Sequence, residues 1–148
     1  MIHDDSQSRP NAPLIDIDSF NCPSGGDSFF YKTSDGVNLR IAIWNETSSK
    51  GTILLQSGRT EFIEKYYEVI QEFVNRGFCV ALMDWRGQGL SDRVAKDIRI
   101  GHVDNFSDYD SDFEEVIRKV YQDSCPKPWI AVGHSMGGCL VASSAAKN

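Results

Sequence analysis

The chain has 148 residues, the length of one ordinary domain, and 41% of them are hydrophobic, which is enough apolar material for a core. Its 15 basic and 21 acidic residues give a net charge of -6 without any lysine or arginine cluster. Such a chain repels phosphate backbones, so nucleic acid is excluded as an expected partner.

The four cysteines and the hydropathy indicate the compartment. Cys22, Cys79, Cys125 and Cys139 are scattered without a CxxC pair, so we predict buried free thiols in a reducing compartment and no metal site. The N-terminal MIHDDSQSRP is polar and acidic, unlike a secretory signal, and no stretch is long and apolar enough to span a bilayer. We therefore predict a cytoplasmic protein and leave peripheral membrane contact and oligomeric state open.

The N-terminal third of the chain predicts a lead-in and a hairpin. Residues 1–27 are rich in Asp, Ser, Asn, Pro and Gly, and we expect them to be loosely ordered. Two β-rich runs follow, FFYKT and VNLRIAIW, and Ser34-Asp35-Gly36 between them is typical of a hairpin turn. The short apolar run 52–56 suits a strand that is buried on both faces.

Helices and strands alternate in the rest of the chain. Spacings of three and four residues predict a helix that Gly77 ends, with an apolar face of Ile63, Tyr66, Tyr67, Ile70, Phe73 and Val74. Residues 78–83 predict the next buried strand. A second helix is expected over about 106–121, with an apolar face of Phe106, Tyr109, Phe113, Val116 or Ile117, and Val120. A strand at 129–132 and a helix from about Met136 complete the series.

The order β-β-β-α-β-α-β-α predicts an α/β fold. We expect a mostly parallel sheet with an antiparallel N-terminal hairpin and helices on both faces. In open sheets of this class, the site lies beyond the carboxyl ends of the strands. Three loops leave strand ends there, namely QSGRTEF, DWRGQGLSD and GHSMGG, and they are expected to converge.

The loop GHSMGG has the pattern of a nucleophile on a sharp turn. In G-x-S-x-G the serine adopts a strained backbone between strand and helix, and the flanking positions must be small because neighbouring backbone comes close. Gly133 and Gly137 fill those positions, Gly138 follows, and an apolar β run precedes. We predict Ser135 as a nucleophile; the alternative is a glycine-rich turn with an incidental serine.

An acyl-transfer site also needs two donors for an oxyanion. The backbone N–H of Met136, directly after the serine, is one expected donor. The other is expected from the loop after the third strand, where Gly58 lets the chain turn so that the N–H of Arg59 faces the site. The alternative for that loop is an ordinary strand-to-helix turn.

The loop DWRGQGLSDR and the histidines are interpreted as structural. Gly87 and Gly89 do not fit a phosphate-binding glycine pattern, so we expect Asp84 and Arg86 to make internal hydrogen bonds beneath the nucleophile turn. His102 has no partner at metal-ligand spacing and is expected to support its own loop. His134 adjoins Ser135, but the turn directs adjacent side chains differently, so it is excluded as the base.

With these residues in view, the chain from about residue 29 onward resembles the α/β-hydrolase superfamily. It is similar in particular to the lysophospholipase and monoacylglycerol lipase branch, which is grouped with serine aminopeptidase-type hydrolases. The similarity lies in four segments: LLQSGRTEFIEKYYEVIQEFVNRGF, DWRGQGLSDR, GHVDNFSDYDSDFEEVI and GHSMGG. It implies that Ser135 forms an acyl-enzyme, that the N–H groups of Arg59 and Met136 bind the oxyanion, that lipid esters are the substrates, and that no cofactor is used.

Two departures from the family pattern matter. Ser57-Gly58 stands where many relatives have His-Gly, which a backbone donor tolerates. In this fold the triad runs Ser, then Asp or Glu, then His, yet residues 136–148 contain none of these acids and no histidine.

We therefore expect residues 28–148 to be the N-terminal half of a hydrolase domain, without the C-terminal strands, the cap and the loops that carry the acid and the histidine. The strand 129–132 is then an apolar edge, and the chain alone is expected to be nearly inactive. Two alternatives stay open: a non-catalytic module that binds a partner through that edge, and a related peptidase or thioesterase.

Overall fold

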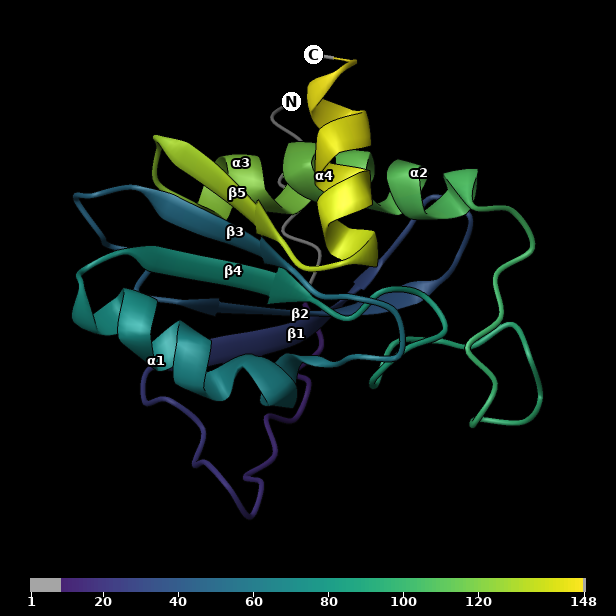
Figure 1. Ribbon diagram of the computed structural model, residues 1–148, viewed down its shortest axis with the longest axis horizontal. Helices are drawn as coiled ribbons and strands as arrows, with labels where there is room; N and C mark the ends of the chain where they lie inside the picture. Colours follow the sequence, from purple (N-terminus) through teal and green to yellow (C-terminus); the bar gives the residue numbers. More distant parts are fainter. Residues whose placement is uncertain (1–8, 148) are drawn as a thin grey trace, which may run out of the picture.

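The structure is a computed structural model that describes residues 9–147 of the chain. The strands in this range are β1 (Gly26–Lys32), β2 (Asn38–Trp44), β3 (Thr52–Gln56), β4 (Cys79–Met83) and β5 (Trp129–Gly133). The helical segments are η1 (Ile63–Tyr66), α1 (Tyr67–Asn75), α2 (Ser107–Val116), η2 (Ile117–Tyr121), α3 (Gln122–Ser124) and α4 (Met136–Ala145). The predicted order of elements is confirmed (Figure 1).

The strands form one mixed sheet in the order β1-β2-β4-β3-β5. β3 lies parallel to both β4 and β5, whereas β2 pairs antiparallel with β1 and β4. The antiparallel part is thus the predicted N-terminal hairpin, together with its junction with β4, which the sequence did not predict. β3 and β4 are buried along their whole length, which explains their continuous apolar sequences.

The predicted hairpin is present. Lys32 pairs with Asn38, the Thr33 N–H donates to the Val37 carbonyl at 2.9 Å, and Gly36 has a φ of 90°. Because residues with a side chain rarely adopt a positive φ, the glycine permits this turn.

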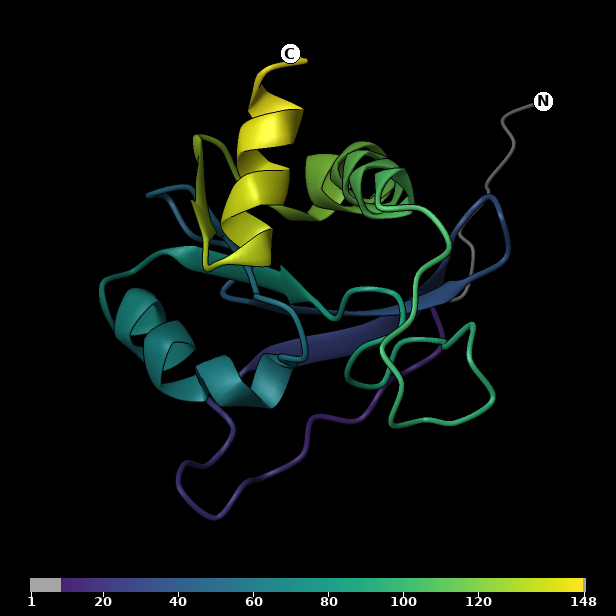
Figure 2. The ribbon, with the colours of Figure 1, turned by 45° about the vertical axis from the view of Figure 1, so that its right-hand side comes forward.

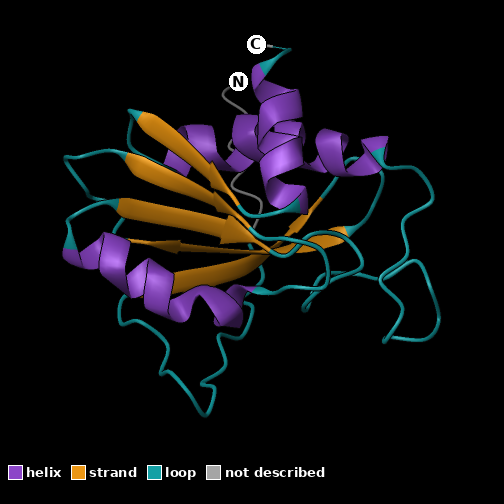
Figure 3. Cartoon of the chain, in the orientation of Figure 1, coloured by secondary structure: helices purple, strands orange, loops and turns teal. Residues whose placement is uncertain are grey.

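Helices cover both faces of the sheet (Figures 2 and 3). On one face, Ile63, Tyr67 and Ile70 pack against a cluster of strand side chains that are all buried: Ala42, Trp44, Ile53, Leu55, Val80 and Leu82. On the other face, side chains of α2, η2 and α4 pack against the alternate strand positions: Leu39, Ile41, Ile43, Leu54, Ala81 and Met83. This two-residue alternation produces two core layers on either side of one sheet.

The second helix is longer than predicted and its apolar face is shorter. After α2 the chain continues through the π-helical turn η2 into α3, so helical structure extends to Ser124. Val116 is fully buried, which decides between it and Ile117. Phe106 was wrongly placed on the buried face, since it precedes α2 and is 51% exposed while its ring meets Tyr109 edge-on.

Residues 9–25 run along the outside of the sheet without a long strand or helix. The Trp44 indole donates to the Pro23 carbonyl at 2.9 Å, and Arg40 donates to the Pro13 carbonyl at 2.9 Å. Leu14 and Ile17 are partly buried against the core layer that contains Trp44. The first eight residues of the expected lead-in lie outside the described residues.

β5 forms one edge of the sheet, as predicted, and its side chains are largely uncovered. Ile130 is 47% exposed and Val132 is 36% exposed.

All four cysteines are free thiols, and two of them, Cys79 and Cys125, are buried. Cys139 is exposed because it lies on the outer side of α4, so its predicted burial is wrong. In the described part of the chain, no helix has both the length and the apolarity to cross a membrane.

Candidate active site

The three loops that leave β3, β4 and β5 converge at one end of the sheet (Figure 1). Trp85, after β4, donates its indole N–H to the Ser57 carbonyl after β3 at 2.9 Å. Gln88 donates to the Gly58 carbonyl at 3.1 Å. Gly58 in turn adjoins the turn after β5, since a Cβ atom there would lie 3.3 Å from the Cβ of Ser135. The predicted convergence is confirmed by these contacts.

Ser135 occupies a sharp turn between β5 and α4. Its backbone has φ 52° and ψ −118°, a conformation that residues other than glycine rarely adopt. The residue is exposed, and its hydroxyl makes no hydrogen bond to any group in residues 9–147. The turn therefore presents the hydroxyl at the surface where the three loops meet.

Close backbone contacts explain the small residues around Ser135. A Cβ atom on Gly133 would lie 2.5 Å from the Cα of Gly138, far inside van der Waals contact. A Cβ atom on Gly137 would lie 2.6 Å from the Ser57 carbonyl oxygen. Gly138 is less constrained, since its nearest contact would be 3.2 Å from the Gly133 oxygen. The turn after β5 thus packs directly on the loop after β3.

His134 is paired with a carboxylate from another loop. Its Nδ1 lies 3.1 Å from Oε2 of Glu61. The same carboxylate accepts the Gly58 N–H at 2.7 Å and the Tyr66 hydroxyl at 2.5 Å. Partial burial of Glu61 disfavours its charged form, but these hydrogen bonds outweigh that effect and lower its pKa to about 2. Glu61 is therefore ionised at neutral pH and holds the two loops together.

The expected oxyanion donors lie on the two adjoining loops. The Met136 N–H is at the first position of α4, where the helix leaves its amide unpaired. Neither this N–H nor that of Arg59 donates to a group in residues 9–147. The Arg59 side chain is exposed and donates to the Gly101 carbonyl at 3.4 Å.

The turn after β3 is made differently from the prediction. Its positive φ, 62°, falls at Thr60, whose N–H donates to the Gln88 side chain at 3.0 Å. Gly58 has an ordinary φ, and it is small because a Cβ atom there would lie 2.8 Å from Glu61 and 3.1 Å from His134. Sequence reasoning did not identify Glu61, Gln88 or Tyr66, because long-range pairing of polar residues leaves no periodic signal.

Asp84 lies at the centre of a buried ionic cluster. One of its oxygens accepts the Ile63 N–H at 2.9 Å, and the other accepts the Leu90 N–H at 2.8 Å and lies 2.7 Å from a guanidinium nitrogen of Arg40. Arg40 also binds both oxygens of Glu64, at 2.6 and 2.7 Å. Burial raises the pKa of Asp84, an effect that Arg40 and the two N–H donors oppose.

Gly89 explains how the loop passes this carboxylate, because a Cβ atom there would overlap the Asp84 oxygens. Asp84 thus organises the start of the DWRGQGLSDR loop from below.

Arg86 connects the same loop to α2. It donates to both oxygens of Asp112, at 2.7 and 2.6 Å, and to Asp35 at 2.9 Å. Gly87 has a φ of 78°, and a Cβ atom there would lie 3.0 Å from the His102 carbonyl oxygen. The exposed His102 ring lies 3.0 Å from Asp104 of its own loop.

Asp84 and Arg86 thus make internal contacts, as predicted from the sequence. Across residues 9–147, no group of three or more His, Cys, Asp or Glu side chains is placed to hold a metal ion.

Comparison with known proteins gives a consistent result. A profile of the family described as serine aminopeptidase, S33, matches residues 47–148. Lysophospholipase L2 of Escherichia coli (strain K12) is 32% identical over 109 residues, which cover 72% of this chain and 31% of that protein. Monoacylglycerol lipase of Mycolicibacterium smegmatis is 31% identical over 115 residues, covering 76% of this chain and 39% of that protein. The chain spans about a third of the length of these relatives.

Solved structures resemble the fold. Alpha/beta hydrolase domain-containing protein 10 from mouse superposes with a TM-score of 0.65 and 20% sequence identity, covering 82% of this chain and 44% of that one. A likeness at this identity shows the fold alone. The α/β-hydrolase fold predicted from the sequence is confirmed, and the chain covers part of it.

Proposed function

Because the chain belongs to the serine aminopeptidase S33 family of hydrolases, we propose that it contains the nucleophile of a serine ester hydrolase acting on lysophospholipids or monoacylglycerols. The main support is the strained, exposed backbone of Ser135, with φ 52° at the meeting point of three loops. Strain of this kind costs about 1–3 kcal/mol and persists where the surrounding structure fixes it. The names of the two bacterial relatives support the choice of lipid esters.

In the proposed reaction, the Ser135 hydroxyl oxygen attacks the acyl carbonyl carbon and its proton passes to a general base. The N–H groups of Arg59 and Met136 donate to the carbonyl oxygen as it becomes negative. The positive end of the α4 dipole lies behind Met136 and favours the same charge. The alcohol leaves with a proton, and water then releases the fatty acid from the acyl-enzyme.

The general base is proposed to lie outside the residues that follow Ser135 in this chain. Residues 136–148 contain no Asp, Glu or His, and within residues 9–147 the Ser135 hydroxyl makes no hydrogen bond to His134. Without a base, a serine nucleophile loses most of the rate gain of a triad. The 148-residue chain by itself is therefore expected to acylate very slowly.

The test uses the protein isolated from its native source with an antibody to this chain, treated with a fluorophosphonate probe and mapped by peptide mass. We expect the label on Ser135, with Ser135→Ala unlabelled and Ser143→Ala, on the following helix α4, labelled normally. Hydrolysis is then compared on lysophosphatidylcholine, a monoacylglycerol, an acyl thioester and a peptide amide. Labelling elsewhere would refute the nucleophile, and faster cleavage of the amide or the thioester would replace the ester assignment with a peptidase or a thioesterase.

A second candidate function is supported by β5. The exposed edge with Ile130 and Val132 is a surface on which another strand can pair. In this alternative the chain is a non-catalytic module that binds a protein partner. Ile130→Lys would then abolish co-purification of that partner while Val69→Lys, an exposed position on α1, would not. Unchanged co-purification with Ile130→Lys would reject edge pairing.

A further inference from the structure

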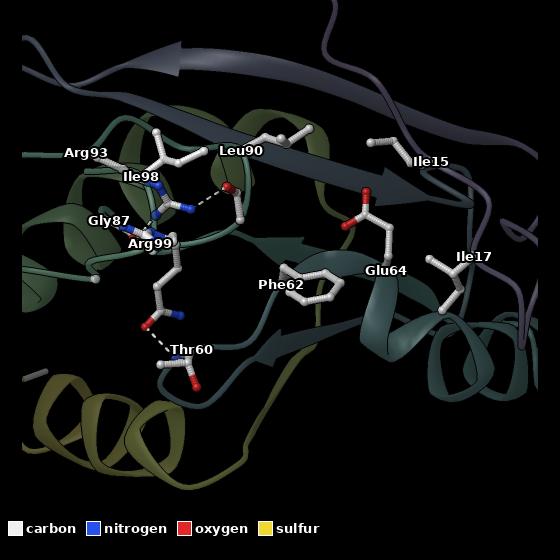
Figure 4. A pocket seen from close by; sticks show the side chains of 13 residues that line it. Ile15, Ile17, Thr60, Phe62, Glu64, Gly87, Leu90, Arg93, Ile98 and Arg99 are labelled. Carbon is white, nitrogen blue, oxygen red and sulfur yellow. Dashed lines mark hydrogen bonds between the residues drawn. The ribbon is translucent and has the colours of Figure 1, made fainter. Parts of the chain in front are cut away.

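A cavity of about 380 Å³ lies beside the candidate active site (Figure 4). Its walls come from the N-terminal segment at Ile15 and Ile17, from the turn before η1, and from residues 87–101. Ser135 is not one of the lining residues. Thr60 and Gln88 are, and the Thr60 N–H donates to the Gln88 side chain at 3.0 Å. Gln88 also donates to the carbonyl of Gly58, the residue that adjoins Ser135. The volume falls within the range of small-molecule sites.

Most of the cavity wall is apolar and open to solvent. Four of the ten exposed large hydrophobic side chains in residues 9–147 line it: Ile15, Phe62, Leu90 and Ile98, with exposed fractions of 49%, 36%, 40% and 75%. Figure 4 shows Leu90 and Ile98 on one side of the cavity and Phe62, Ile15 and Ile17 on the other. Gathering of exposed apolar groups around a hollow is typical of a binding site.

Among the described residues, the charges that line the cavity include one cation without a carboxylate partner. Glu64 faces the cavity, but Arg40 binds both of its oxygens. Arg99 is paired with Asp97 at 2.8 Å. Arg93 has no carboxylate partner within the described residues, and it donates to the Gly87 carbonyl and, at 3.0 Å, to that of Gly89. These backbone bonds fix the guanidinium without cancelling its charge, and they use two of its five N–H groups.

From this combination we propose that the cavity binds a single-chain amphiphile with an anionic head. Arg93 donates to a carboxylate or phosphate oxygen of the head, and the hydrocarbon chain lies along Phe62, Leu90 and Ile98. Carboxylate and phosphate both match the guanidinium, so the head comes either from a free fatty acid or from a lysophospholipid. Binding here is separate from acyl transfer and does not require Ser135.

Isothermal titration of the full chain tests this proposal with three probes: dodecanoate and dodecyl phosphate below their micellar concentrations, and dodecanol below its solubility limit. We expect one saturable site for the two anions and weaker binding of the alcohol, which has the same chain but no charge. Tighter binding of dodecanoate would identify the fatty-acid source, and tighter binding of dodecyl phosphate would identify the lysophospholipid source. Equal binding of all three probes, or no saturable binding, overturns the proposal.

Matched variants assign the site. Arg93→Met is expected to weaken binding of the two anions about tenfold and to leave binding of dodecanol unchanged. Arg93→Lys is expected to retain most of the affinity for the anions. Arg118→Met, on η2 outside the cavity, is the charge control. Leu90→Ser is expected to weaken binding of all three probes about threefold or more. Val69→Ser, at a position with the same 40% exposure, is its control.

Two further measurements separate binding from folding and from catalysis. Because Arg93 also braces two loop carbonyls, urea midpoints accompany the titrations and distinguish a binding loss from unfolding. Ser135→Ala is expected to bind the anions normally, so a failure of the esterase proposal would leave this one standing. Anion binding that survives both Arg93→Met and Leu90→Ser would place the ligand elsewhere and contradict the inference.

Discussion

The imidazole of His134 lies 3.1 Å from the carboxylate of Glu61, which joins the turn after β5 to the turn after β3. Glu61 also accepts the Gly58 N–H at 2.7 Å, so a single carboxylate fixes the two backbones whose amides we propose as oxyanion donors. A histidine next to a serine nucleophile invites assignment as its base. Within the described residues, however, the Ser135 hydroxyl makes no hydrogen bond to His134, whereas the ring Nδ1 contacts Glu61, so we assign His134 to the support of the turn.

The pH dependence of stability should report on Glu61. Its pKa is lowered from 4.5 to about 2 in the folded protein, so its ionised form is stabilised by folding. That contribution is fully present above about pH 5 and is lost as pH falls through the folded value near 2. Glu61→Gln is therefore expected to be less stable at pH 7, with a difference from the wild type that shrinks below pH 5.

Urea denaturation at a series of pH values measures this difference. Lys65, which pairs with Glu61 at 3.3 Å and is half-exposed, provides the control variant Lys65→Met. Surface pairs of this kind contribute about 0–1 kcal/mol, so Lys65→Met is expected to have little effect at any pH. A constant gap between Glu61→Gln and wild type from pH 7 to pH 3 would contradict the assigned pKa.

The glycines of the nucleophile turn are expected to differ in tolerance. Gly137→Ala places a Cβ atom 2.6 Å from the Ser57 carbonyl oxygen, so backbone must move and we expect a loss of about 2 kcal/mol or more. Gly138→Ala meets its nearest atom at 3.2 Å and gains helix propensity of about 1 kcal/mol, so its net effect should be small. Equal urea midpoints for the two variants would show that the loop after β3 does not press on α4.

The buried cluster of Arg40, Glu64 and Asp84 predicts a large cost for losing one partner. Glu64→Ala leaves the fully buried Arg40 guanidinium with one carboxylate in place of two, and we expect a loss of about 3–5 kcal/mol. Glu72→Ala removes the exposed pair with Arg76, at 2.5 Å and about 60% exposure, and should cost about 0.5 kcal/mol or less. Similar thermal or urea midpoints for the two variants would mean that burial of the cluster contributes no penalty.

Local patterns predicted most of the fold because they reflect local physics. The continuous apolar runs of β3 and β4, the helical spacing from Ile63 to Val74 and the Asp35-Gly36 turn all appear in the structure where the sequence indicated. The two misplaced residues lie at the margins of the core: Phe106 precedes α2, and Cys139 lies on the exposed side of α4. At such positions an apolar side chain can face either way, and only the packing of neighbouring elements decides.

The strained backbone turn of the candidate site was predictable from the sequence, whereas its polar side-chain contacts were not. The glycine spacing around Ser135 indicated a strained turn, and the structure has it. The pairing of Glu61 with His134 spans 73 positions, and that of Arg40 with Glu64 spans 24. A charged residue has the same local signature whether it ends in water or in a buried ion pair, so these partners become visible only when the sheet brings them together.

The strained backbone of Ser135 is expected to lower the stability of the folded protein. Ser135→Gly removes the Cβ atom from a φ of 52°, which relieves about 1–3 kcal/mol of strain, while the added freedom of glycine in the unfolded chain costs about 0.5–1 kcal/mol. The net expectation is a stabilised protein without a nucleophile. Ser135→Ala keeps the Cβ atom and should show the same loss of labelling without the gain in stability.

Ser143→Gly, within α4, is expected to change stability in the opposite direction. This residue lies inside α4 and donates to Asp110 at 3.2 Å, so glycine there should destabilise by about 0.5–1 kcal/mol or more. Urea denaturation of the three variants compares the two positions directly. Destabilisation by Ser135→Gly as large as that by Ser143→Gly would mean that the turn is relaxed, so that backbone strain no longer supports a nucleophile at Ser135.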